Sequence, residues 1–190
     1  MNKIKKGKLI VIVAPSGTGK STLIERLKND FPMLSWSVSC TTRSIRTGEV
    51  NGVNYHFISK EDFEQRIAQN EFVEWALVHS NYYGTSKQFV QEGLDEGKYL
   101  LFDIDVQGAD IIKKSFGSDA EVIFIEPPSV DELKARLLKR ATDPHHVIEE
   151  RVNNAVKELE RKADFDHLVM NDDVELAYKK LHKIFKEIIG

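Results

Sequence analysis

Cysteine is almost absent from this chain of 190 residues, in which Cys40 is the only one. A single cysteine excludes an internal disulfide and gives no basis for a metal site built from several thiolates. It suits a reducing compartment, so the cytoplasm is the expected location. A role as catalytic nucleophile is disfavoured for Cys40, because the surrounding segment Ser37–Thr41 has the residue types of a strand.

Long apolar runs are also lacking, although 41% of the residues are hydrophobic. No segment approaches the roughly 20 apolar residues that span a bilayer, so a membrane protein is not expected. The formal net charge is −3 and the basic residues are dispersed, which argues against broad nucleic-acid binding. There are neither internal repeats nor low-complexity linkers, and the length fits one domain or one core with an inserted lobe.

A glycine-rich segment between an apolar strand and a helix is the most informative feature of the chain. The apolar run Leu9–Val13 precedes it, and its residues are Ala14-Pro15-Ser16-Gly17-Thr18-Gly19-Lys20-Ser21-Thr22. This order is typical of a phosphate-binding loop (P-loop), in which backbone N–H groups and a helix start surround phosphate oxygens. The glycines let the backbone curl, Lys20 supplies a cation, and the Ser21 hydroxyl can bind Mg²⁺.

Two details bear on this assignment. Ala14 stands where the strict pattern has glycine, which requires a negative φ at that residue. Glycine-rich turns also occur without a ligand, but the intact Gly19-Lys20-Ser21 behind a buried strand favours phosphate binding. Asp103 follows the apolar run Tyr99–Phe102 and would be placed to hold Mg²⁺ through water.

Alternating strand and helix patterns predict an α/β fold with a doubly wound parallel sheet. Strands are expected at 8–14, 36–42, 55–58, 72–78, 82–85, 99–105, 120–125 and 167–170. Helices are expected at 20–30, from Ser59 onward, and at 86–96, 129–140, 147–162 and 174–189. Residues 38 to about 90 are predicted to form a small mixed lobe inserted into the P-loop core.

A second polar cluster is predicted inside this lobe. Arg43 and Arg46 are spaced i, i+3 on a polar loop, and arginine forks bind phosphate oxygens in pairs, although two solvated surface arginines are the plain alternative. Carboxyl and phenol groups in the same lobe favour a site; they are Glu49, Tyr55, Glu74 and Tyr83. Tyrosine hydroxyls can complete a phosphate shell. A carboxylate can accept from guanine N1–H and its 2-amino group, whereas adenine N1 is an acceptor.

The segment Thr41–Ile58 resembles the guanylate kinase signature: Thr-Thr-Arg, a basic residue, an acidic residue, then Gly, Tyr and an aromatic residue at fixed spacing. The resemblance continues through Glu71–Ala76, Asn81–Gly84, Asp103–Gly108, Pro127–Ser129 and Val169–Asp173, and covers about 6–187. It implies Mg²⁺-dependent transfer of the ATP γ-phosphate to GMP, giving ADP and GDP in purine metabolism. GMP or dGMP and ATP would be the small-molecule partners. The oligomeric state stays open between monomer and homodimer.

The resemblance also implies roles at matching positions. The GMP side would be formed by Ser39, Arg43, Arg46, Glu49, Tyr55, Glu74, Tyr83, Thr85 and Asp105. The ATP side would be formed by Ala14 to Thr22 and by Asn171, which is expected near the adenine. The transferred phosphate would be acted on by Lys20, Arg136, Arg140 and Arg151, with Ser21 and Asp103 at Mg²⁺.

The implied division is a P-loop core (1–37, 97–136 and 157–190), a GMP-binding lobe (38–96) and a helical lid (137–156). His145 and His146 fall at the lid tip, Thr142–His146, and are expected to be solvated there. Adjacent histidines point apart on a helix, which disfavours a shared metal.

Two other functions compete with this one. The first is a binding module, since guanylate-kinase-like domains can bind phosphopeptides without catalysis; the intact Lys20, Ser21 and Asp103 disfavour it. The second is a kinase for AMP or dTMP. Glu74 and the Thr-Thr-Arg signature oppose that activity, because a site built on buried hydrogen bonds rejects the wrong base strongly.

Overall fold

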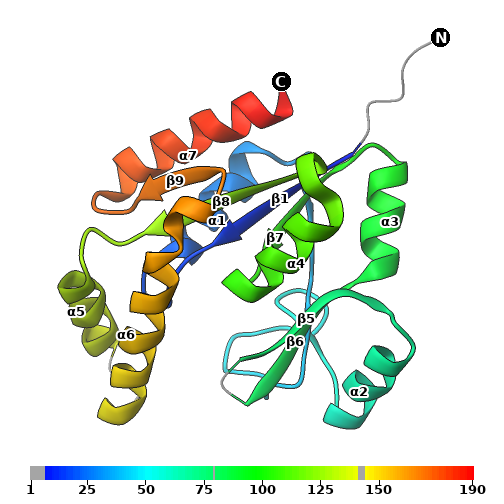
Figure 1. Ribbon diagram of the computed structural model, residues 1–190, viewed down its shortest axis with the longest axis horizontal. Helices are drawn as coiled ribbons and strands as arrows, with labels where there is room; N and C mark the ends of the chain where they lie inside the picture. Colours follow the sequence, from blue (N-terminus) through cyan, green and yellow to red (C-terminus); the bar gives the residue numbers. More distant parts are fainter. Residues whose placement is uncertain (1–6, 79, 141–143) are drawn as a thin grey trace. The chain divides into compact units, whose positions relative to one another are not determined.

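The computed structural model describes residues 7–78, 80–140 and 144–190 (Figure 1). The chain divides into two compact units, and each collects segments that are far apart in the sequence. The signature unit contains Met1–Ile10, Met33–Asp103 and Gln107–Ala120. The phosphate-loop unit contains Val11–Pro32, Ile104–Val106 and Glu121–Gly190.

A five-stranded sheet supplies much of the core. Its strands, in order across the sheet, are β2 (Ser35–Trp36), β7 (Tyr99–Asp103), β1 (Lys8–Val13), β8 (Ala120–Glu126) and β9 (His167–Met170). β2 pairs with β7 in parallel, and β8 pairs with β9 in parallel. The apolar runs Leu9–Val13 and Leu100–Phe102 are fully buried, as expected for parallel strands covered on both faces. The predicted α/β fold with a parallel sheet is confirmed.

The phosphate-loop unit contains α1 (Lys20–Asp30), α5 (Val130–Arg140), α6 (His145–Glu160) and α7 (Val174–Ile189), with a 3-10 turn at Lys162–Asp164. α1 and α7 are joined by an ion pair from Arg26 to Glu175 and by a hydrogen bond from the Tyr178 hydroxyl to Asp30. α5 and α6 lie side by side (Figure 1). Their shared apolar cluster consists of Leu133, Leu137, Ile148 and Ala155, with Val152 against it.

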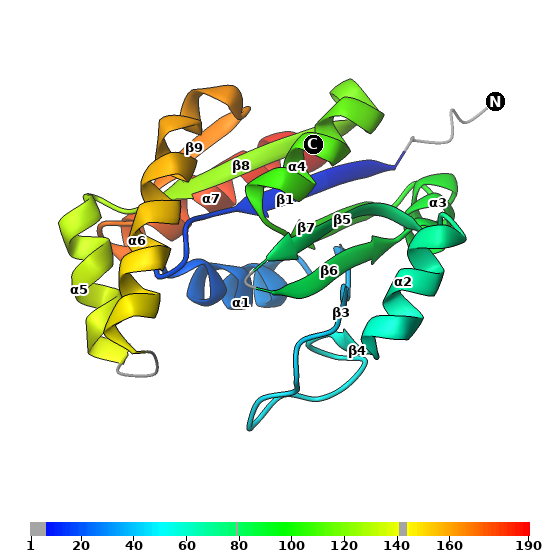
Figure 2. The same ribbon diagram turned by 60° about the horizontal axis from the view of Figure 1, so that its bottom comes forward.

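The signature unit contains a second sheet of four strands, which Figure 2 shows together with α2. Their order is β4 (His56–Phe57), β3 (Cys40–Thr41), β6 (Asn81–Ser86) and β5 (Phe72–Val78). β3 runs parallel to β4 and antiparallel to β6, and β6 is antiparallel to β5. The helices are α2 (Lys60–Ala68) and α3 (Lys87–Asp95); α4 (Val106–Phe116) begins at the unit boundary and leads into a 3-10 turn, Gly117–Asp119.

Several predicted ends of strands and helices shift by one or two residues, and sequence and structure differ further in two elements. The strand predicted at 36–42 is instead two short strands in different sheets, β2 and β3, so the chain leaves one sheet and enters another at Ser37–Ser39. α4 has no counterpart among the predicted elements. α6 begins at His145 rather than at 147. None of the helices in the described ranges is long and apolar enough to cross a membrane.

Candidate functional site

The predicted phosphate loop leads from β1 into α1 and folds back on itself. Thr18 is fully buried and donates twice to the Pro15 carbonyl, from its N–H at 3.2 Å and from its hydroxyl at 2.6 Å. Gly17 and Gly19 have φ of 91° and 92°, in the left-handed region that favours glycine. Ala14 has no positive φ, as the alanine at this position requires.

The helix that follows this loop begins without a side-chain cap. Gly19 is the N-cap residue, and Lys20 and Ser21 are the first two residues of α1. A glycine cannot accept the N–H bonds of the first turn with a side chain, so these donors suit an anion. No acidic residue lies in the first turn of α1 to compete with a phosphate for that place.

Two residues from distant parts of the chain donate hydrogen bonds to the loop. Asn171 follows β9 and donates from Nδ2 to the Thr18 carbonyl at 2.6 Å. Arg136, on α5, donates from Nη1 to the Thr18 carbonyl at 3.4 Å and to the Asn171 carbonyl at 3.1 Å. The prediction that Asn171 lies near the adenine stays a prediction, while its side chain is directed at the loop.

The three predicted lid arginines differ in what the structure describes. The guanidinium of Arg136 is held on its own helix by a hydrogen bond from Nε to Glu132 at 3.0 Å, in addition to its contacts with the loop. Arg151 is half-buried on α6. Arg140 is the last residue of α5, and its side chain lies outside the described part of the structure.

Glu158, on α6, is a residue that the sequence analysis missed. Burial raises the pKa of its carboxyl group to about 7; the Asp105 charge also raises this pKa, whereas the Lys20 ammonium lowers it. The carboxyl group is therefore in electrostatic range of the loop lysine. The sequence carries no signal for this, because Glu158 stands in a charged helix with Glu149, Glu150 and Glu160.

A buried carboxylate in the signature unit matches the predicted base-reading position. Glu74 is 4% exposed and faces the fully buried Thr85 across the β5–β6 pair. The Thr85 hydroxyl donates to Oε1 of Glu74 at 2.5 Å, which orients the carboxylate. Ser39, predicted beside them, is also buried and directly precedes β3. A buried carboxylate with a fixed orientation can accept two parallel N–H donors, as guanine presents.

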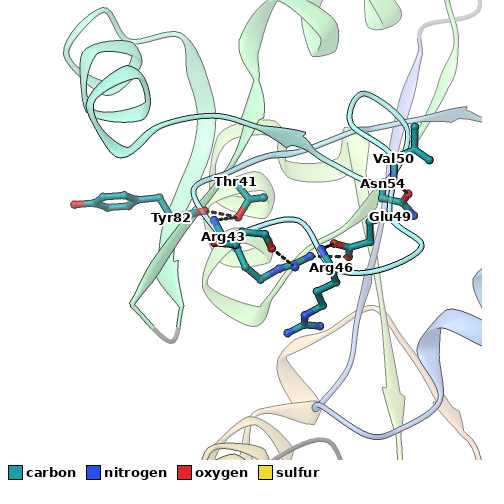
Figure 3. Close-up of polar contacts among 8 residues, drawn as sticks. Thr41, Arg43, Arg46, Glu49, Val50, Asn54 and Tyr82 are labelled. Atoms are coloured by element: carbon teal, nitrogen blue, oxygen red, sulfur yellow. Dashed lines mark hydrogen bonds and ion pairs between the residues drawn. The ribbon is translucent and has the colours of Figure 1, made fainter.

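Arg43 is the fixed member of the arginine pair (Figure 3). Its side chain is 12% exposed and lies over the rings of Tyr55 and Phe57, with centroids at 5.4 and 5.6 Å. Nη2 donates to Oε1 of Glu49 at 2.7 Å, and Nη1 donates to the Ser44 carbonyl at 2.7 Å. These contacts hold the guanidinium in one orientation.

Glu49 connects the two arginines by different atoms. Its Oε2 accepts the backbone N–H of Arg46 at 2.8 Å, while the exposed Arg46 side chain extends away from it (Figure 3). The hydrogen bond from Arg43 lowers the pKa of the Glu49 carboxyl group, so Glu49 stays ionised. The segment from Arg43 to Glu49 therefore presents one fixed guanidinium, that of Arg43, and one exposed guanidinium, that of Arg46.

The two predicted tyrosines lie together in this unit. Tyr55 and Tyr83 meet edge to face with ring centroids 5.9 Å apart. Burial raises the pKa of Tyr55 to about 12, and the charge of Asp103 contributes. Tyr55 is thus a neutral hydroxyl at any ordinary pH and can donate a hydrogen bond to a phosphate oxygen.

The carboxylates predicted near Mg²⁺ and on the GMP side lie at the end of β7 or follow it closely. Asp103 is exposed at the end of β7, and Asp105 is half-buried two residues later. Among the described residues there is no group of three acidic, histidine or cysteine side chains that could hold a metal. Mg²⁺ held mainly by substrate phosphates needs few protein ligands, and the predicted ones, the Ser21 hydroxyl in the phosphate-loop unit and the Asp103 carboxylate in the signature unit, stay a prediction. His145 and His146 are exposed at the start of α6.

A buried strand of a parallel sheet, followed by a glycine-rich loop and a helix without a side-chain cap, defines a P-loop nucleotide-binding protein. A family model described as guanylate kinase matches residues 6–188. A guanylate kinase of Sulfurimonas denitrificans is 46% identical over 180 residues, which are 95% of this chain and 87% of that protein. One of Clostridium perfringens is 47% identical over 187 residues, 97% of this chain and 86% of the relative.

A solved structure has the same fold. The crystal structure of guanylate kinase from Anaplasma phagocytophilum has a TM-score of 0.77 and 28% identity, covering 96% of this chain and 86% of that one. The chain belongs to the guanylate kinase family.

Proposed function

We propose that this protein transfers the γ-phosphate of ATP to GMP, with Mg²⁺, and releases ADP and GDP. The observation that carries the choice of acceptor is the buried Glu74 carboxylate, oriented by Thr85 in the same unit as the fixed Arg43. A carboxylate for the guanine edge and a guanidinium for the phosphate together fit GMP.

On the acceptor side, the phosphate of GMP or dGMP is bound by Arg43 and Arg46 together with the hydroxyls of Tyr55 and Tyr83. Glu74, Thr85 and Ser39 bind the guanine, and Asp105 completes this side. Glu49 belongs to it through its contacts with both arginines. Base selection is strong, because a nucleotide whose base lacks the two guanine donors does not make the hydrogen bonds that guanine makes to the buried Glu74 carboxylate.

On the donor side, the N–H groups of the loop from Ala14 to Thr22 surround the ATP phosphates, and Lys20 neutralises the charge that spreads during transfer. By the family resemblance Ser21 and Asp103 would be the protein ligands of Mg²⁺, which would neutralise charge on the phosphate oxygens. Arg136, Arg140 and Arg151 contribute further positive charge. The proposed division keeps the core, the GMP-binding lobe (38–96) and the lid (137–156) given by the family resemblance.

The chemistry needs positioning rather than a base. The GMP phosphate is already an anionic nucleophile, so transfer requires the two nucleotides to meet in line and water to be excluded. A lid that carries arginines can meet both requirements, the positioning of the nucleotides and the exclusion of water. It completes the site only when the nucleotides are bound. The cytoplasm, with ATP, Mg²⁺ and a reducing environment for Cys40, is the proposed location.

The test is a coupled assay of ADP release with ATP and Mg²⁺ in the presence of GMP, AMP, dTMP or no acceptor. The proposal expects rapid release with GMP alone. Lys20→Ala should abolish turnover and leave GMP binding largely intact. Release with AMP or dTMP at the same rate would contradict the base assignment. No release with any acceptor, together with retained GMP or phosphopeptide binding, would favour a binding module.

A further inference from the structure

The side chain of Asn171 is buried against the phosphate loop. It is 5% exposed, and its Nδ2 donates the 2.6 Å hydrogen bond to the carbonyl oxygen of Thr18, which is itself fully buried. The amide also lies close to Gly19, where an added β-carbon would come within 2.6 Å of Nδ2. Buried amides are held by such bonds, and this one fixes the direction of a loop carbonyl.

The Thr18 carbonyl belongs to the same peptide group as the Gly19 N–H, so the contact with Asn171 also orients that N–H. A trans peptide is planar, so its C=O and N–H point in opposite directions, and no described peptide bond is cis. Holding the Thr18 carbonyl against Asn171 therefore directs the Gly19 N–H to the other side of the loop. Phosphate oxygens bind on that side in a loop of this kind.

Asn171 is itself held at the end of paired strands. Its backbone N–H donates to the carbonyl of Glu126, the last residue of β8, at 2.8 Å, and β8 pairs with β9, which ends at Met170. The contact thus runs from the sheet to the loop across 153 residues of sequence. It does not depend on a surface turn for its position.

Arg136 shares the same acceptor. Its Nη1 contacts the Thr18 carbonyl at a longer distance than Asn171 does, 3.4 Å against 2.6 Å. Under the proposed function Arg136 contributes charge to the ATP phosphates, and a guanidinium turned toward phosphate leaves this carbonyl. Asn171 would then be the remaining donor to it.

We propose that Asn171 is a positioning residue of the phosphate loop: its amide holds the Thr18 carbonyl so that the Gly19 N–H faces the phosphates. The inference rests on the proposed function for the identity of the ligand, ATP. It differs from an adenine contact in one consequence, because a loop-holding residue affects every phosphate chain that the loop binds, with or without a base.

The experiment measures binding of MgATP and of inorganic tripolyphosphate with Mg²⁺ by calorimetry. The variants are Asn171→Ala, Asn171→Asp and, as a matched control, Asn29→Ala at the exposed end of α1. We expect Asn171→Ala to lower the affinity for both ligands alike, by roughly tenfold for the loss of one buried hydrogen bond. Asn171→Asp should weaken both further, because a carboxylate oxygen would face the Thr18 carbonyl. GMP binding and the Asn29 variant should change by less than about twofold.

A loss of ATP affinity with unchanged tripolyphosphate affinity would overturn the inference and assign Asn171 to the base. Unchanged affinity for both ligands would overturn it as well. If Asn171→Ala does not fold, Asn171→Ser is measured instead, by the rise in melting temperature that each ligand produces. A protein that binds both ligands with the expected pattern but does not phosphorylate GMP would refute the proposed function and leave this inference standing.

Discussion

The two proposed anion-binding regions of this molecule are built in opposite ways. The phosphate loop offers backbone N–H groups, and its carbonyls are fixed by hydrogen bonds from Asn171, Thr18 and, at a longer distance, Arg136. The signature unit offers the Arg43 side chain, whose orientation is fixed by a charged acceptor, Glu49. The first arrangement depends on backbone conformation and close packing. The second depends on an ion pair, which salt and charge substitutions weaken more easily.

The largest effect is expected at Glu74, the carboxylate proposed to bind the guanine. Glu74→Gln replaces one acceptor oxygen by a donor that faces the guanine donors, so kcat/KM for GMP should fall by roughly 1000-fold. The ATP affinity should change by less than about twofold, because Glu74 belongs to the signature unit. Steady-state kinetics with each substrate varied in turn measures both.

The control for this variant is Glu61→Gln, at an exposed position on α2. Equal losses for GMP and ATP in the Glu74 variant would remove Glu74 from guanine recognition. They would also remove the contrast between the two regions.

Gly19→Ala should break the phosphate loop without touching the arginine site. Its β-carbon would lie 2.6 Å from Asn171 Nδ2, and its φ of 92° is strained for alanine. We expect MgATP affinity to fall by roughly 100-fold, equivalent to ~3 kcal/mol, with GMP affinity retained. Gly117→Ala is the matched control, because Gly117 also has a positive φ, 55°, but no atom within 4 Å of an added β-carbon. Similar ATP affinities in the two variants would show that the packing against Asn171 is unimportant.

Glu49→Gln sharpens the comparison from the other side. The amide keeps an acceptor for Arg43 but removes the charge, so we expect KM for GMP to rise roughly tenfold with kcat little changed. The difference from wild type should shrink as salt is added, because the ion pair is screened. Kinetics at low and high ionic strength measure this. An effect confined to ATP kinetics, or one that grows with salt, would contradict the assigned role.

Glu158→Gln should have the smallest effect, and on stability rather than affinity. The pKa of Glu158 is raised from 4.5 to about 7 in the folded protein, so the folded state binds more protons between these values than the unfolded state. The free energy of unfolding of wild type therefore falls as pH rises through this window. The variant lacks this contribution and should gain about 1 kcal/mol on wild type between pH 5 and pH 8, a value reduced for partial exposure. Thermal melts of both proteins across this range test it, and a constant difference would refute it.

Local patterns identified much of the fold. The prediction of β9 and α7 matches the structure at every boundary. The start of α7 is fixed by Asp173, which accepts the N–H groups of Glu175 and Leu176. The prediction of one strand at 36–42 was wrong, because an alternating pattern shows that a segment is extended but not which sheet it joins. The sequence does contain a signal for α4: Val106, Ala109 and Ile112 are buried at helical spacing.

The site divides in the same way. The phosphate loop and the arginine cluster are each formed by one short segment of the sequence, so the residue types of each segment alone predict its chemistry. Asn171 and Glu158 reach the loop through the fold, from strands and helices more than a hundred residues away. Their role in the loop could not be predicted from the sequence, because neither belongs to a local pattern that names the loop as its target.

The single cysteine has a practical consequence that follows from its burial. Cys40 is 3% exposed in β3, packs against Phe63 and Phe72, and burial raises the pKa of its thiol. A thiol reagent can reach it only when this sheet opens, so the labelling rate counts opening events of the four-stranded sheet. Since no other cysteine contributes to the signal, labelling rates of the unaltered protein with and without GMP measure whether GMP slows the opening of that sheet.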